Sequence, residues 1–572
     1  MRLFYFFLLF SWAISVTATP ILVDPKDRFS PTAAKQGMVV ASEAYATQAS
    51  LEILKQGGNA IDAAVTLGFA MAVTAPRAGN LGGGGFMLIY DAKTQKVLAI
   101  DYREKAPALA YKDMYLDEKG DIVPKRSLFT HLAAGVPGTV AGLALALEKY
   151  GTISLQRALQ PAIQLATDGF PMPATLATAI QQAQKRFQHS KASQATFMKS
   201  DGRFYQEGEL FKQPALAKTL MLIAQQGISA FYTGHIADQI VAEMRANQGL
   251  ISKADLAAYQ PKIRQPIRGT YRGFDVFSMS PPSSGGVHIV QILNMLEPFD
   301  LKQTGHNSAQ TIHIMTEAMK RAYADRSAYL GDTDFVSVPL QGLTHKKYAK
   351  QLVTEFDLQN VTPSKHIKQG QPAIYESPET THYSVVDVQG NAVANTYTLN
   401  FSFGSGITVQ GAGFLLNNQM DDFSAKPNVA NAYGLIGGSA NAIEPHKRML
   451  SSMSPTIVLK DNQPFLVTGS PGGSRIITSV LQVILNVIDH EMNIQEAVNA
   501  TRIHHQWLPD TLFMETGLSL DTITLLHDKG HTLESSRTMG ATNSILIQHN
   551  GNERTLYGAA DPRRPEGIIA GF

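Results

Sequence analysis

Residues 380–400 read TTHYSVVDVQGNAVANTYTLN, in which two stretches of alternating apolar and polar residues flank the turn sequence QGN. A period of two predicts β-strands, and a glycine followed by an asparagine between them predicts a tight turn. If Gln389 is the centre of this hairpin, Thr380 and Thr398 lie at equal distances from the turn and face each other. Opposed residues have Cβ atoms about 4.5–5.5 Å apart, which allows the two hydroxyl groups to form a hydrogen bond.

A polar segment precedes this hairpin. Residues 356–379 contain three prolines and predict a linker that ends at Thr380. A threonine hydroxyl becomes an effective nucleophile when a base adjoins it, and the α-amine of an N-terminal threonine is one such base. That amine has a pKa of about 7.7–8.0, so part of it is neutral near pH 7. The pattern is typical of a chain that is cut between Glu379 and Thr380.

Helical patterns and glycines dominate the sequence before the linker. Residues 43–56 have helical spacing and stop at Gly57, and Asn59 is a candidate cap for an apolar helix over 60–73. The glycine run 82–85 opens a strand, because glycine permits close approach of two backbones. The other elements expected before the linker are a strand over 96–104 and helices over 138–149, 154–167 and 311–329.

The remaining segments complete the fold prediction. The polar stretch 184–213 predicts a solvated surface region. Beyond the hairpin, 451–461 and 464–473 predict strands, and 474–490 predicts a buried helix. Strand pairs with helices before and after them predict an α/β (α+β) fold with helical layers outside paired sheets.

Composition excludes several classes of function. The 572 residues are 44% hydrophobic and 17% charged, which is typical of a globular protein. The 49 basic residues nearly balance the 47 acidic ones, so no basic surface for nucleic acid is expected, and the expected partners are small molecules or further copies of the protein itself. Because the chain has no cysteine, disulfides, thiol catalysis and thiolate metal sites are excluded.

The N-terminus has the pattern of a secretory signal. Arg2 precedes an apolar run over 3–16, and small residues follow up to Ala18. The run is shorter than the ~20 apolar residues of a membrane-spanning helix, so we expect removal of residues 1–18 and no stable membrane anchor afterwards. The mature chain is expected to be periplasmic or secreted.

Nine short motifs occur in an order typical of one enzyme family. They are GGNAIDAAV (57–65), GNLGGGGFML (79–88), DYREKAP (101–107), GVPGTVAGL (135–143), TTHYSVVD (380–387), LLNNQMDDFS (415–424), KRMLSSMSPT (447–456), TGSPGGSRI (468–476) and HHQW (504–507). Over nearly all of its mature length the chain resembles the γ-glutamyltranspeptidases, which are N-terminal nucleophile hydrolases.

The resemblance implies a specific architecture and maturation. It implies a four-layer αββα sandwich and self-cleavage before Thr380, in which the Thr380 hydroxyl attacks the carbonyl of Glu379. The products would be a large subunit, residues 19–379, and a small subunit, residues 380–572, which stay associated as a heterodimer. The resemblance implies no cofactor and no metal.

The resemblance also implies the chemistry. Thr380 would take the γ-glutamyl group of glutathione or a similar donor as an ester, which water or the amine of an amino acid or dipeptide then resolves. Thr398 would bond to the nucleophile, and the backbone N–H groups of Gly472 and Gly473 would stabilise the oxyanion. The substrate-binding residues implied by the motifs are Arg103, Ser451 and Ser452 for the α-carboxylate, Asn400, Gln419 and Asp422 for the α-ammonium, and Tyr433 on a lid over 426–438.

Other functions were weighed against this one. The adjacent His504 and His505 suggest a metal hydrolase, but neighbouring side chains diverge on a strand or helix and no H-E-x-x-H motif occurs. No G-x-S-x-G serine motif occurs, and the glycines at 82–85 lack the lysine of a phosphate loop. A cephalosporin or glutaryl acylase, a polyglutamate capsule depolymerase and an exported binding protein stay open as alternatives.

Overall fold

The computed structural model describes residues 30–372 and 382–572, with the exceptions of 428, 537 and 552. The expected signal segment 1–18, the cleavage site at Glu379 and Thr380, and the neighbouring Thr381 lie outside the described residues. Within the described ranges, none of the helices has the length and hydropathy to cross a bilayer.

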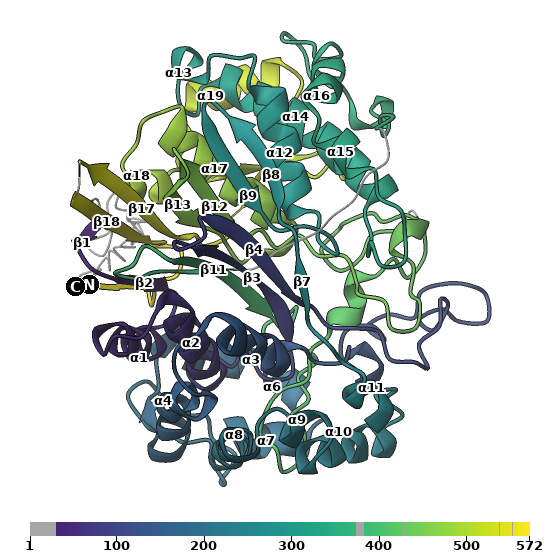
Figure 1. The fold of residues 1–572 in the computed structure, drawn as a ribbon. Coiled ribbons are helices and arrows are strands. Elements are labelled where there is room, and N and C mark those ends of the chain that lie inside the picture. Colours follow the sequence, from purple (N-terminus) through teal and green to yellow (C-terminus); the bar gives the residue numbers. More distant parts are fainter. Residues whose placement is uncertain (1–29, 373–381, 428, 537, 552) are drawn as a thin grey trace, which may run out of the picture.

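Two seven-stranded antiparallel sheets form the centre of the molecule (Figure 1). In spatial order the first sheet consists of β19 (Ile568–Gly571), β2 (Met38–Ala41), β10 (Tyr383–Val386), β11 (Ala392–Thr398), β3 (Gly84–Asp91), β4 (Lys96–Tyr102) and β7 (Lys262–Arg264). The second consists of β1 (Thr32–Ala34), β18 (Glu553–Ala560), β17 (Asn543–Asn550), β13 (Gln463–Thr468), β12 (Thr456–Lys460), β9 (Phe274–Ser278) and β8 (Ile267–Tyr271).

Strands from before and after the predicted cut are mixed in both sheets. In the first sheet, β2 lies between β19 and β10, so it is hydrogen-bonded on both sides to strands of the C-terminal part. In the second sheet, β1 pairs with β18 and β9 pairs with β12. Neither part of the chain therefore builds a complete sheet alone.

Helices cover the outer faces of both sheets (Figure 1). On the side of the first sheet lie α1 (Ala44–Lys55), α2 (Ala60–Thr74), α3 (Thr139–Tyr150), α4 (Leu155–Asp168) and α8 (Pro214–Gln226); on the other side lie α12 (Gly285–Leu296), α14 (Ala309–Tyr329), α16 (Lys346–Val353) and α17 (Ile476–Ile488). The prediction of paired sheets with helical layers outside them is confirmed.

Shorter elements connect and flank these layers. The helices among them are α5 (Ala174–Gln182), α6 (Gln184–Phe187), α7 (Lys191–Phe197), α9 (Ser229–Tyr232), α10 (His235–Ala246), α11 (Lys253–Ala257), α13 (Leu301–Thr304), α15 (Leu340–Leu343), α18 (Ile494–Asn499) and α19 (Leu520–Asp528). The strands are β5 (Phe170–Pro171), β6 (Leu210–Phe211), β14 (Ile503–His504), β15 (Leu512–Glu515) and β16 (Leu533–Ser536).

The first two helices begin at side-chain caps, and the cap at Asn59 was predicted. The side chain of Glu43 accepts hydrogen bonds from the backbone N–H groups of the first turn of α1. Asn59 and Asp62 form a reciprocal capping box at the start of α2. Each box satisfies N–H groups that a helix leaves without intrahelical partners, which explains why α2 can start next to a glycine pair.

The hairpin of β10 and β11 has the predicted register. Tyr383 pairs with Asn395, and Val386 pairs with Ala392, so Gln389 is the centre of the turn. Alternate side chains of both strands contribute to different cores: Val385 faces α2 and its neighbours, whereas Val386 packs between the sheets. Both faces of the hairpin are buried, which restricts its register because a slip of one residue would exchange the two faces.

The prediction of a solvated surface for residues 184–213 holds for only part of the segment. Many of its polar residues are exposed, but the segment also forms α6, α7 and β6 and buries three aromatic rings. Phe187 stacks on Phe197 with ring centroids 5.0 Å apart, and Phe197 lies 6.3 Å from Phe211. The polar residues between these rings face outward. Because lysines and glutamines are so numerous in this segment, its widely spaced buried aromatic residues gave no recognisable apolar pattern.

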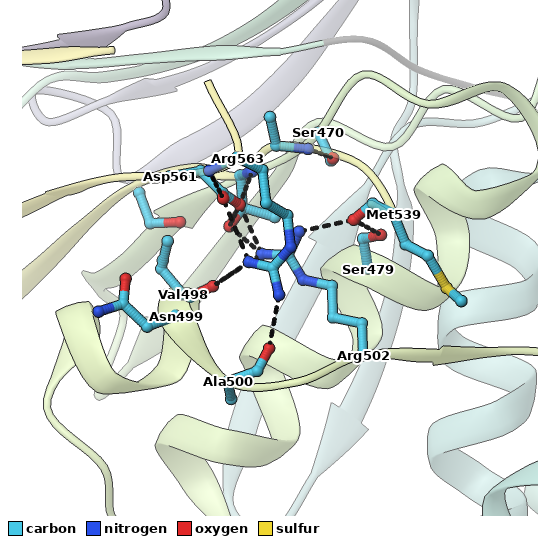
Figure 2. A network of polar contacts seen from close by, with 12 residues as sticks. Ser470, Ser479, Val498, Asn499, Ala500, Arg502, Met539, Asp561 and Arg563 are labelled. Carbon is cyan, nitrogen blue, oxygen red and sulfur yellow. Dashed lines mark hydrogen bonds and ion pairs between the residues drawn. The ribbon is translucent and has the colours of Figure 1, made fainter. Parts of the chain in front are cut away.

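A buried ionic network joins the C-terminal elements to the loop that contains Met539 and Ala541, which lies near Gly472 and Gly473 (Figure 2). Arg502 donates to Asp561 Oδ2 at 2.6 Å and to the carbonyl oxygen of Met539 at 2.7 Å. Arg563 lies on the other side of Asp561 at 3.2 Å. Because Ala541 N–H donates to Ser470 Oγ, the network holds the strand end that leads into the glycines.

Candidate active site

Most of the predicted site residues line one cavity of about 480 Å³. They come from the end of β11, the loop after it, the lid and the loop that leads into α17. The predicted residues that line this cavity are Thr398, Asn400, Gln419, Asp422, Tyr433, Ser451, Ser452, Gly472 and Gly473. Arg103 lies behind the wall, and Glu379 and Thr380 are outside the described residues.

Thr398 ends β11 next to the predicted glycine run. Its hydroxyl oxygen accepts a hydrogen bond from the N–H group of Asn400 at 2.9 Å. A Cβ atom on Gly83 would lie 2.1 Å from the carbonyl oxygen of Thr398, so β3 can approach β11 here only because this residue is glycine. The residue predicted to face Thr398, Thr380, lies outside the described residues.

Asp422 is held from two sides at the cavity wall. Its Oδ2 accepts from Arg103 Nη2 at 2.5 Å and from Gln419 Nε2 at 2.7 Å, while its side chain keeps 12% exposure. Arg103 is fully buried, and its Nη1 has no hydrogen-bond partner among the described residues. The pair therefore offers an acid to the cavity and an unsatisfied cationic donor behind it.

Two further acids next to this pair have perturbed pKa values. Burial raises the pKa of Glu104, which lies 3.7 Å from Arg103, to about 7. Burial also raises the pKa of Asp421 to about 6, although a hydrogen bond from Ser127 lowers it. Burial therefore makes both carboxyl groups weaker acids than free side chains, and a pKa of about 7 leaves Glu104 partly protonated near neutral pH.

The serine pair has a cationic support that the sequence analysis missed. Arg326 donates from Nη2 to Ser452 Oγ at 3.1 Å and from Nε to Ser284 Oγ at 2.9 Å, and it lines the cavity. The backbone of Ser451 is fixed by bonds to Pro282 and Ser284. An arginine on α14, whose residues are almost all buried, was the signal that could have revealed this role.

The glycine pair needs its residue type for steric reasons. Gly472 and Gly473 have φ angles of 139° and 59°, in the region that side-chain-bearing residues avoid. A Cβ atom on Gly473 would lie 2.6 Å from the Tyr433 ring. The glycines therefore let the lid aromatic approach the backbone that leads into α17.

Tyr433, on the segment 426–438 that is predicted to be a lid, lines the cavity. Its hydroxyl donates to the carbonyl oxygen of Asn400 at 3.0 Å, and its ring meets Phe401 edge to face at 5.2 Å. The lid turn is organised by Asn431, whose Oδ1 accepts from the N–H groups of Tyr433 and Leu435. Residue 428 of the lid lies outside the described residues.

The HHQW motif is hydrogen-bonded to the predicted lid segment 426–438. Gln506 Nε2 donates to the carbonyl oxygen of Gly434 at 3.0 Å, so its Oε1 is left to accept from His504 Nε2 at 3.0 Å. His504 Nδ1 then accepts from Thr478 Oγ1 at 2.9 Å. Burial lowers the pKa of His504 to about 3, so the ring is neutral. A neutral ring with its proton on Nε2 donates to Gln506 and accepts from Thr478.

His504 and His505 do not converge on one point. His505 Nε2 lies 3.4 Å from Asp510, on a different side from the partners of His504. The metal hydrolase suggested by two adjacent histidines has no support from this geometry.

Replacing Gln506 should loosen the lid. In Gln506→Leu the bond to Gly434 is lost, and a neutral hydrogen bond contributes about 0.5–1.5 kcal/mol, so we expect roughly 2- to 10-fold faster hydrogen exchange at Asn431 and Leu435. Mass spectrometry of exchanged peptides measures this change. Gln351→Leu, on the exposed face of α16, is the control; equal exchange in the two variants would contradict the role of Gln506.

Comparisons with known proteins agree with this geometry. The family model described as gamma-glutamyltranspeptidase matches residues 46–571. A glutathione hydrolase proenzyme from Escherichia coli is 55% identical over 565 residues, covering 98% of this chain and 97% of that protein.

Two solved structures are also similar. The cephalosporin acylase from Bacillus halodurans has a TM-score of 0.84 at 28% identity, covering 98% of this chain and 99% of that one. The Helicobacter pylori gamma-glutamyltranspeptidase has a TM-score of 0.58 at 48% identity, covering 59% of this chain and 96% of that one. From the family match over almost the whole length and the 55% identical relative, we conclude that this chain belongs to the gamma-glutamyltranspeptidase family.

Proposed function

We propose that this protein is a self-processed γ-glutamyltransferase and glutathione hydrolase. The observation that carries the proposal is Asp422 at the cavity wall, held by Arg103 and Gln419, in the same cavity as Ser451 and Ser452. A γ-glutamyl group carries an α-ammonium and an α-carboxylate, and this wall offers one partner of suitable charge for each. The E. coli relative named as a glutathione hydrolase proenzyme supports the same substrate class.

In this proposal the chain matures by cutting itself before Thr380. The Thr380 hydroxyl attacks the carbonyl carbon of Glu379, and the acyl group moves from the Thr380 nitrogen to its oxygen, so that an ester replaces the peptide bond and the α-amine is freed. Water then hydrolyses the ester, which releases the Glu379 carboxyl group and restores the Thr380 hydroxyl. Removal of residues 1–18 and this cut leave subunits 19–379 and 380–572. Together they form one αββα sandwich of the N-terminal nucleophile hydrolase type, and the mixing of their strands in both sheets favours a lasting heterodimer.

The catalytic cycle has two steps. The Thr380 amine accepts the hydroxyl proton while the oxygen attacks the γ-carbonyl carbon of the donor, and the N–H groups of Gly472 and Gly473 hold the oxyanion. The amide nitrogen leaves with that proton, and an ester remains on Thr380. Water or an acceptor amine then attacks the ester and returns the proton, giving hydrolysis or transfer. Thr398, which is predicted to face Thr380, orients the nucleophile.

Substrate recognition divides between two groups of residues. Asp422, with Gln419 and Asn400, binds the α-ammonium. Ser451, Ser452 and Arg103 bind the α-carboxylate, and Arg326 raises the positive charge behind Ser452.

Tyr433 then covers the bound glutamyl group and limits donors to compact molecules. The donors are small γ-glutamyl compounds and the acceptors are amino acids or peptides, with no cofactor required. We place the enzyme in the periplasm or outside the cell, on the basis of the N-terminal signal pattern.

The donor preference tests this function. We expect the purified enzyme to release chromophore from a γ-glutamyl anilide roughly 10²-fold more efficiently than from a glutaryl anilide, because the glutaryl group lacks the α-ammonium that Asp422 would bind, and loss of one partner from a charge pair costs about 2–5 kcal/mol. N-terminal sequencing of the smaller fragment should read Thr380 first. Equal use of the two anilides would instead favour a glutaryl acylase.

A further inference from the structure

The hydroxyl groups of Ser451 and Ser452 each accept one hydrogen bond from the protein. Ser452 Oγ accepts from Arg326 Nη2 at 3.1 Å. Ser451 Oγ accepts from the N–H group of Met453 at 3.2 Å. Among the residues that the structure describes, neither hydroxyl donates to a protein acceptor. Both serines line the cavity, so each has an O–H hydrogen available for a molecule bound there.

The bond between Arg326 and Ser452 has only one possible direction. A guanidinium group has N–H donors and no acceptor, so the serine oxygen must be the acceptor. A hydroxyl has a single hydrogen, and because this hydrogen does not lie between Oγ and the guanidinium, it is directed at another partner. Donation from a cation also polarises the hydroxyl, since hydrogen bonds in a chain strengthen one another. Ser452 is therefore prepared as a donor, which is what a carboxylate requires.

The same guanidinium is bonded to Ser284, the residue that precedes α12. Arg326 Nε donates to Ser284 Oγ at 2.9 Å, and that hydroxyl donates to the carbonyl oxygen of Ser451 at 2.9 Å. The N–H group of Ser284 donates to the same carbonyl oxygen at 2.9 Å. Arg326 thus orders both cavity serines, Ser452 through its side chain and Ser451 through its backbone.

This arrangement requires an arginine rather than any cation. Nε and Nη2 belong to one planar group, so their N–H bonds reach Ser284 and Ser452 from a fixed fork. A lysine ammonium is a single point at the end of a flexible stem and has no such fork. The fork is also held in place by packing, because Arg326 is only 5% exposed and lies on a helix whose residues are almost all buried.

We propose that Arg326 is a positioning residue that directs the O–H group of Ser452 at the α-carboxylate of the bound donor. This inference rests on the proposed function, in which that carboxylate binds at the serine pair. The hydroxyl supplies the bond to the substrate, and the guanidinium fixes the direction of that bond. Because the α-carboxylate is separated from the γ-carbonyl by three carbon atoms, the contact should affect binding of the donor more than the chemical step.

A double-mutant cycle in the mature enzyme tests this role. The kcat/KM for the γ-glutamyl anilide is measured in the wild type, Arg326→Met, Ser452→Ala and the combined variant. A hydrogen bond to a charged group is worth roughly 10- to 100-fold in binding, so Arg326→Met should lower kcat/KM about 10-fold or more, mainly through a higher KM. In the Ser452→Ala background the same substitution should lower it less than about threefold, because the hydroxyl that Arg326 directs is absent.

Two more variants separate direction from charge and from folding. Arg326→Lys keeps the charge but lacks the fork, so its kcat/KM should stay close to that of Arg326→Met. Arg321→Met is the matched control, since it removes another buried arginine of α14, one that donates to Glu317 and to the carbonyl oxygen of Glu355. Any loss that this control causes should be equal with and without the Ser452 hydroxyl.

Ser284→Ala provides the measurement if the Arg326 variants are not cut to the mature form. It removes the fully buried acceptor of Nε, and we expect a loss of about 2- to 10-fold in kcat/KM that again disappears in the Ser452→Ala background. Equal losses in the two backgrounds, or a wild-type kcat/KM in Arg326→Lys, would overturn the positioning role while leaving the proposed function intact. A wild-type enzyme that cleaves no γ-glutamyl compound would overturn both.

Discussion

Thr380→Ala is expected to remain one uncut chain and to lose turnover by at least about 10⁴-fold, as is typical when a covalent nucleophile is removed. Without the hydroxyl no ester can form at Glu379, and without the cut no α-amine is available as the base. A denaturing gel should show a single band, where the wild type shows subunits 19–379 and 380–572. Release of chromophore from the γ-glutamyl anilide measures the activity.

Two further substitutions, one at Thr380 and one at the adjacent Thr381, test whether the Thr380 hydroxyl itself is the nucleophile. Thr380→Ser keeps a hydroxyl and should still be cut, whereas Thr381→Ala should be cut like the wild type, because the side chain of the next strand residue points to the opposite face. A Thr380→Ala chain that is still cut would refute the mechanism. A wild-type chain that is never cut would instead favour an exported binding protein.

Arg502→Met is expected to destabilise the fold by about 3–5 kcal/mol, the usual effect of removing one partner from a buried ion pair. The substitution takes the shortest bond from Asp561 and leaves the carbonyl groups of Met539 and Val498 without this donor (Figure 2). Because Asp561 also orders Thr542 at 2.7 Å, the loop that contains Met539 and Ala541 should loosen with it.

The measurement is a shift of the urea midpoint in the uncut Thr380→Ala background, where folding involves a single chain. Arg268→Met is the matched control, since exposed pairs such as Arg268 with Asp275 contribute only about 0–1 kcal/mol. Equal midpoints in the two variants would contradict a structural role for the network.

The sequence predicted those parts of the fold that depend on local patterns. The register of β10 and β11 followed from a period of two and a central turn, and the start of α2 followed from its cap. The aromatic cluster of 184–213 was missed because its rings are ten or more residues apart, and only tertiary packing brings them together.

The site divides in the same way. The predicted lining residues gather around one cavity because they belong to motifs at the ends of strands or in adjoining loops. Arg326 comes from the long helix α14, where no motif distinguishes it, and an arginine among mainly apolar helix residues was the one available signal. Its contact with Ser452 depends on how distant elements pack, so the sequence pattern did not reveal the contact.

The sharing of strands between the two parts of the chain has a consequence for how the enzyme persists. Before the cut, β2 and its partners β10 and β19 belong to one chain, so refolding is a first-order process. After the cut the same sheet must be rebuilt from two molecules, and the recovery rate falls with dilution. Self-cleavage would thus make refolding inefficient. The lifetime of the mature enzyme should then be set by its unfolding rate, and therefore by the height of the unfolding barrier, rather than by refolding.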